Sequence, residues 1–157
     1  MSDFKIQSGQ KVVFIGDSIT DCGRSQEFKP LGHGYVHMVV NLSTAKYPSR
    51  KIEWINRGIS DDTVQGLVER WTEDVIEEKP NWVSIAIGIN NVAREQASSR
   101  SLKECLEDFE ASYRNILDRT REETSANLVM FEIFYLKEED QHERNLNVEA
   151  YNEVIHR

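Results

Sequence analysis

The chain has 157 residues, 39% of them hydrophobic and 29% charged, and its formal net charge is −8 at pH 7. This length and balance predict a single soluble domain, residues 1–157, with a buried core. The negative charge argues against a nucleic-acid backbone or an anionic membrane surface as a partner, and no apolar run approaches the ~20 residues of a membrane-spanning helix.

The first residues and the cysteines bear on the cellular compartment. Residues 1–5 lack the basic and apolar blocks of a secretory signal, so a cytoplasmic location is the default expectation. Cys22 and Cys105 have no metal-ligand spacing. We expect both to be free thiols, as in a reducing compartment.

Four apolar runs predict β-strands at residues 11–16, 51–56, 82–87 and 128–134. Apolar residues at helical spacing predict helices over about 34–45, from the capping residues 60–62 to just before Pro80, over 102–117 and over 146–155. Loops are expected at 17–33, at 90–101 (with room for one helical turn) and at 137–144. Because strands and helices alternate, the fold class is α/β, with a parallel sheet covered on both faces.

Three polar or small residues follow three of the predicted strands: Ser18, Gly58 and Asn90. The carboxyl ends of parallel strands meet at one edge of a sheet, where open α/β folds bind ligands. A serine hydroxyl there can attack an ester carbonyl. The backbone N–H groups of Ser18 and Gly58 and the Asn90 side-chain amide could form an oxyanion hole. Taken singly, each residue also fits a strand end, a turn glycine or a loop cap.

The segments around these residues carry a further signal. Residues 14–20 read Phe-Ile-Gly-Asp-Ser-Ile-Thr, residues 56–63 read Asn-Arg-Gly-Ile-Ser-Asp-Asp-Thr, and residues 87–92 read Ile-Gly-Ile-Asn-Asn-Val. In this order and spacing they resemble the first three conserved blocks of the GDSL/SGNH serine hydrolases. The resemblance implies Ser18 as the nucleophile, Gly58 as the oxyanion glycine and Asn90 as the oxyanion asparagine.

The same resemblance sets expectations for the whole protein. It implies a flavodoxin-like three-layer α/β/α sandwich that hydrolyses esters of small acyl groups, sugars or lipids, with no metal or organic cofactor. Two alternatives stay open. The first is a flavodoxin-like module that binds phosphate or flavin through its Gly-Asp-Ser-Ile-Thr turn. The second is a catalytically inactive relative that binds its ligand without turnover.

The sequence departs from the family pattern in several places. Asn91 stands where the family usually has aspartate, and Asp61 where a glycine is common. The family's Asp-x-x-His block, which supplies the catalytic base, does not occur. His33, and His142 with Glu139 three residues before it, are candidate replacements, whereas His37 and His156 suit surface or packing roles.

The missing block suggests a C-terminally shortened chain with four strands present and the fifth absent. The outer edge of the fourth strand would then be unpaired, so self-association through this edge is predicted.

Overall fold

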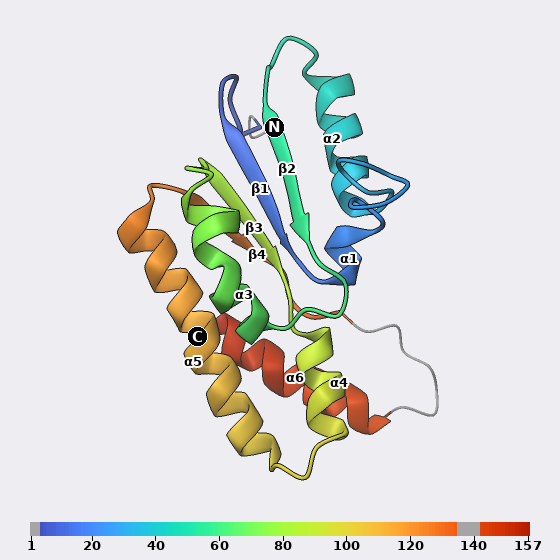
Figure 1. Ribbon diagram of the computed structural model, residues 1–157, viewed down its shortest axis with the longest axis vertical. Coiled ribbons are helices and arrows are strands. Elements are labelled where there is room, and N and C mark those ends of the chain that lie inside the picture. The colour runs from blue at the N-terminus through green and yellow to red at the C-terminus, as the bar shows by residue number, and fades with distance from the viewer. Residues whose placement is uncertain (1–3, 135–141) are drawn as a thin grey trace.

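Four parallel strands form the centre of the computed structural model, which describes residues 4–134 and 142–157, with side chains from residue 147 in the second range. The strands are β1 (Lys11–Gly16), β2 (Glu53–Gly58), β3 (Trp82–Ala86) and β4 (Asn127–Met130). They pair in the order β2-β1-β3-β4, so β4 lies at one edge of the sheet (Figure 1). The predicted α/β class and parallel sheet are confirmed.

Helices cover both faces of this sheet. They are α1 (Ser18–Asp21), α2 (Tyr35–Lys46), α3 (Val64–Trp71), α4 (Ile89–Gln96), α5 (Leu102–Glu123) and α6 (His142–His156); a π-helical turn, Thr72–Ile76, continues α3. In the described part of the chain, none of the helices is both long and apolar enough to cross a bilayer.

Side chains of β1 alternate between two hydrophobic clusters. Val13 and Ile15 lie in the larger cluster, which also holds buried residues of α3, α5 and α6. Val12 and Phe14 point to the other face and pack with Val36 of α2 in a smaller cluster. A strand that is buried on both faces is typical of a sheet between two helical layers, so the three-layer arrangement is confirmed.

Several element boundaries differ from the sequence-based expectation. The polar segment 90–101 contains the two-turn helix α4, and the predicted loop 17–33 begins with the short helix α1. The α4 segment looked like a loop because its core-facing side is narrow, with Val92 as its one fully buried residue. The second strand ends at Gly58 rather than Asn56.

The fourth strand is shorter than predicted. It ends at Met130, although the apolar run continues to Phe134. The backbone N–H and carbonyl of Ile133 bind the side chain of Asn152 in α6, at 2.7 and 2.9 Å, in place of a neighbouring strand. The predicted loop 137–144 falls largely on residues 135–141, outside the described residues; α6 already begins at His142.

Candidate active site

The sheet register brings the three predicted site segments together. Gly16, the last residue of β1, pairs with Gly58 of β2 on one side and with Ala86 of β3 on the other. Ser18 begins α1 two residues after Gly16, and Asn90 lies in α4 four residues after Ala86. The carboxyl ends of β1, β2 and β3 therefore form one local edge that carries Ser18, Gly58 and Asn90.

Ser18 is presented to solvent by a tight turn at the end of β1. Asp17 caps α1, because its Oδ1 accepts a hydrogen bond from the Ile19 N–H at 3.0 Å. Ser18 itself is exposed, and neither its hydroxyl nor its N–H has a hydrogen-bond partner among the described residues. Both groups are free to meet a ligand.

Gly58 lets α1 pack directly against β2. A Cβ atom added at Gly58 would lie 2.2 Å from the Asp21 nitrogen, so no larger residue fits without displacing α1. The Gly58 N–H donates to Asn56 Oδ1 at 2.8 Å, and Asn56 Nδ2 donates to the Thr20 carbonyl at 2.6 Å. The predicted oxyanion donor of Gly58 is thus engaged within the chain.

Asn90 is oriented by the turn that precedes α3. Its Nδ2 donates to the Asp62 carbonyl at 2.9 Å, and the second N–H of this amide has no partner in the part of the chain that the structure describes. Beside it, Asp61 adopts a left-handed conformation with φ 64°, and its N–H is likewise without a partner among the described residues. One N–H of the Asn90 amide and the N–H of Asp61 are therefore without partners among the described residues.

Asn91, the residue that departs from the family's aspartate, has a different role from Asn90. Its Oδ1 accepts from the Val64 N–H at 3.1 Å, and its Nδ2 donates to Gln65 Oε1 at 2.8 Å. It therefore joins α4 to the first turn of α3 through uncharged hydrogen bonds.

One guanidinium connects the elements that carry the site. Arg70 Nε donates to Asp62 Oδ2 at 2.8 Å, Nη1 to the Arg57 carbonyl at 2.8 Å, and Nη2 to the Gly16 carbonyl at 3.2 Å. Nη1 also pairs with Asp74. The Arg70 side chain is 15% exposed, so it fixes the ends of β1 and β2 and the Asp62 turn from a largely buried position.

Asp17 gives the site an unusual electrostatic feature. Its side chain is buried, and its Oδ2 has no hydrogen-bond partner in the described residues. Burial, and then the negative charge of Asp62, raise the pKa of Asp17, whereas the Ile19 N–H acts in the opposite direction. Asp17 also borders an apolar hollow of about 20 Å³ with Ile19, Ile87 and Ile133.

The histidines for which a side chain is described each have a hydrogen-bond partner other than Ser18. His33 Nδ1 lies 2.6 Å from the Cys22 carbonyl, His37 Nε2 lies 3.1 Å from Asn41, and His156 Nε2 lies 2.8 Å from Glu132. The other candidate pair falls outside this description: Glu139 is not among the described residues, and of His142 only the helical backbone is. Cys22 and Cys105 are free thiols, as expected.

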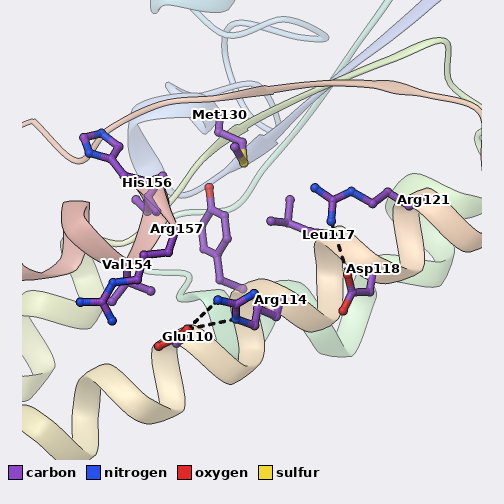
Figure 2. Close-up of a pocket in the computed structure, with 11 residues that line it drawn as sticks. Glu110, Arg114, Leu117, Asp118, Arg121, Met130, Val154, His156 and Arg157 are labelled. Atoms are coloured by element: carbon purple, nitrogen blue, oxygen red, sulfur yellow. Dashed lines mark hydrogen bonds and ion pairs between the residues drawn. The ribbon is translucent and has the colours of Figure 1, made fainter.

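A separate cavity of about 200 Å³ lies on α5, away from these strand ends. It is bounded by α5, by Met130 at the end of β4 and by the last residues of α6, including Val154. Figure 2 shows Arg114 and Arg121 on its α5 wall, each paired with a carboxylate of the same helix. With its two arginines neutralised in this way, the cavity has no free cation on that wall.

Two residues that support the site were not identified from the sequence. Arg70 and Asn56 support the site; Arg70 lies outside the quoted motifs, and Asn56 opens the second of them but was given no role there. A buried asparagine within an apolar strand was the one available signal for Asn56. Arg70 lies between the apolar positions of its helix, where a charged side chain usually faces solvent.

Comparison with known proteins identifies close relatives. A sequence profile of the GDSL-like lipase/acylhydrolase family matches residues 14–157. The chain is 42% identical over 159 residues to a protein named acetylxylan esterase from Geobacillus stearothermophilus, with 96% of this chain and 72% of the relative covered.

Solved structures agree with this match. A variant of Axe2, an acetyl xylan esterase from the same organism, superposes with a TM-score of 0.85 at 42% identity, covering 98% of this chain and 73% of that one. LAE5, an alpha/beta hydrolase enzyme from the metagenome of Lake Arreo, Spain, superposes with a TM-score of 0.85 at 28% identity, covering 96% and 72%. Other solved Axe2 variants are described as catalytic mutants and carry alanine in place of a serine, an aspartate or a histidine.

The Arg70 contacts predict a large effect of Arg70→Met. The substitution removes the cation facing Asp62 and three carbonyl or carboxylate contacts, and breaking such a buried pair costs about 3–5 kcal/mol. Arg57→Met is the matched control. Without Arg57, Asp74 still pairs with Arg70, and Glu78 still pairs with Lys11. Because Arg57 is more exposed, we expect its loss to lower the free energy of unfolding by under about 1 kcal/mol. Urea denaturation measures both values, and equal losses in the two variants would contradict the role given to Arg70.

Proposed function

We propose that this chain, which belongs to the GDSL-like lipase/acylhydrolase family and is a serine ester hydrolase, removes short acyl groups from carbohydrate esters through Ser18. One observation carries the proposal. The register of β1, β2 and β3 brings the free hydroxyl and N–H of Ser18 to the same edge as the anchored amide of Asn90. A nucleophile beside preoriented donors is the arrangement that acyl transfer requires.

In this mechanism the Ser18 oxygen attacks the ester carbonyl, and the negative charge that forms on the carbonyl oxygen is stabilised by hydrogen-bond donors. The Ser18 N–H and the second Asn90 N–H are two such donors. Gly58 is the third donor of the proposal, and to act it must exchange Asn56 for the substrate oxygen.

The proposed substrate class rests on two observations. The hollow bordered by Asp17 and Ile19, the residues before and after Ser18 in the chain, is apolar and holds only about 20 Å³. This is room for little more than one water-sized group, so it offers no space for a long acyl chain. The relative from Geobacillus stearothermophilus is named an acetylxylan esterase, which supports a carbohydrate as the alcohol part of the ester.

The first step also needs a base to accept the Ser18 proton, because a serine hydroxyl is a weak nucleophile at neutral pH. His33 is the candidate for which a side chain is described. Its Nδ1 is held by the carbonyl of Cys22, the residue that caps the end of α1, and its ring packs at a tilt against Phe28 with centroids 4.3 Å apart. This leaves Nε2 as the nitrogen that could accept a proton.

Hydrolysis of nitrophenyl acetate by the chain and by Ser18→Ala tests the proposed nucleophile. We expect a rate above that of buffer for the unmodified chain and a loss of this excess in Ser18→Ala, because the attacking oxygen is gone. Equal rates for the two proteins would contradict the role of Ser18 and favour a relative that binds its ligand without turnover.

Asn90→Ala tests the oxyanion contribution. Loss of one such donor costs about 2.7–4 kcal/mol of barrier, or about 10²- to 10³-fold in kcat. Asn91→Ala removes the neighbouring amide, which joins α3 to α4, so it should lower stability more than kcat. The kcat values of Asn90→Ala and Asn91→Ala, measured with nitrophenyl acetate, test the oxyanion role of Asn90. A similar kcat for both variants would contradict this role.

We further propose that the chain self-associates through the free edge of β4. Val129, Met130 and Phe131 are each 42% exposed there, and an unpaired apolar edge favours pairing with another strand. In sedimentation velocity the chain should form dimers or larger species with rising concentration, and Val129→Lys should restore the monomer. Leu42→Lys, on the exposed face of α2, is the control. A monomer at all concentrations would refute self-association.

A further inference from the structure

A second recess lies beside the turn that holds Asn90. This polar groove, of about 320 Å³, runs between α3, α4, α5 and α6 and is lined by Thr63, Gln65, Asn91, Arg94 and Tyr151, among others. Its volume falls at the lower end of the range of about 300–1,000 Å³ that is usual for small-molecule sites. Neither the comparisons nor the proposed mechanism gives it a role.

The charges along the groove cancel. Arg94 and Arg100 line it together with Glu95 and Asp108, and Arg100 forms an ion pair with Asp108 at 2.7 Å. The rest of the rim carries amides and hydroxyls. A groove with many donors and acceptors but no net charge favours a neutral polyhydroxylated ligand over an anion or a cation.

Tyr151 supplies the observation that points to a ligand. The side chain is 1% exposed, and its ring packs edge-on against Phe109 with centroids 4.8 Å apart. Its hydroxyl has no hydrogen-bond partner among the described residues. Burial, then Cys105 and Glu95, raise the pKa of this phenol. Tyr151, Cys105 and Glu95 all line the groove.

Tyr113 is a second buried tyrosine, and its hydroxyl differs from that of Tyr151 in solvent access. Its hydroxyl also lacks a partner, but the oxygen is fully sealed from solvent. The Tyr151 oxygen is not completely sealed from solvent, so it can be reached from the groove. A buried hydroxyl is normally hydrogen-bonded, and a ligand hydroxyl in the groove would provide the missing bond.

The turn at residues 61–63 connects the groove with the site. The Asp62 carbonyl holds Asn90 of the site. The Asp61 carbonyl accepts a hydrogen bond from Arg94 at 2.8 Å, and both Arg94 and Thr63 line the groove. This one turn therefore contacts residues of both the site and the groove.

We propose that the polar groove binds a sugar unit of the ester substrate, one or more units away from the acylated sugar, with the Tyr151 hydroxyl as a hydrogen-bond partner. This inference rests on the proposed function, in which Ser18 cleaves an acyl ester of a carbohydrate. The groove then contributes to binding of an oligosaccharide, but not of a small ester that ends at the site.

Two substrates separate this role from a structural one. Tyr151→Phe removes one oxygen and keeps the ring against Phe109. With an acetylated xylo-oligosaccharide we expect KM to rise about 2- to 10-fold, the loss of one neutral hydrogen bond, with kcat nearly unchanged. With nitrophenyl acetate both constants should match those of the unmodified chain. Tyr113→Phe, the matched control, should change neither KM.

A second variant tests the groove at a residue other than Tyr151. Gln65→Ala, on the exposed rim, should raise the same KM without affecting the small ester. An unchanged KM for the oligosaccharide in both Tyr151→Phe and Gln65→Ala would overturn the proposal. So would an equal rise for both substrates, because that result would place the effect at Ser18 or in the fold.

Binding without turnover distinguishes failure of this inference from failure of the proposed function. Calorimetry with a deacetylated xylo-oligosaccharide, on the Ser18→Ala chain and on Ser18→Ala with Tyr151→Phe, should show weaker binding in the double variant. Loss of Ser18-dependent hydrolysis with this difference retained would overturn the proposed function alone. Ser18-dependent hydrolysis with no oligosaccharide binding would overturn the groove proposal alone.

Discussion

A largely buried guanidinium, that of Arg70, holds together the parts of the chain on which the site depends. It binds the carbonyls at the ends of β1 and β2 and the carboxylate of Asp62. The carbonyl of Asp62 in turn fixes the Asn90 amide. Ser18 and Asn90 are 72 residues apart in the sequence, so their joint position depends on tertiary contacts such as these, because local structure alone cannot impose it. Donors held in place before the substrate arrives need no reorganisation as charge develops.

Close backbone packing is the second constraint. Gly58 allows α1 to touch β2, and Asn56 fixes that contact by bonding the Thr20 carbonyl and the Gly58 N–H. The same bond that stabilises the turn occupies a donor that the sequence pattern assigns to the oxyanion. Asp61 lies in the left-handed region, which favours glycine. Two backbone N–H groups of this region therefore differ: that of Gly58 is engaged by Asn56, and that of Asp61 has no partner among the described residues.

Much of the fold follows from local sequence. The strand at 11–16 and the helix at 102–117 were predictable because an unbroken apolar run and a long 3.6-residue repeat each have one dominant interpretation. Helix α4 was missed because its burial rests chiefly on Val92, and the end of β4 was missed because Asn152, a distant residue, captures the backbone of Ile133. Ser18 and Asn90 could be named from motifs, whereas the roles of Asn56, Arg70 and Tyr151 come from contacts between distant segments. A single sequence carries no pattern for such contacts.

Ser18 is the proposed nucleophile at the edge formed by β1, β2 and β3. Incubation with an organophosphonate ester, followed by peptide mass spectrometry, tests this role most directly, because the reagent forms a stable adduct with an activated serine. We expect one adduct, on Ser18, and markedly slower labelling of Asn90→Ala, which lacks one donor to the phosphonyl oxygen. No adduct on Ser18, or labelling that Asn90→Ala leaves unchanged, would contradict it.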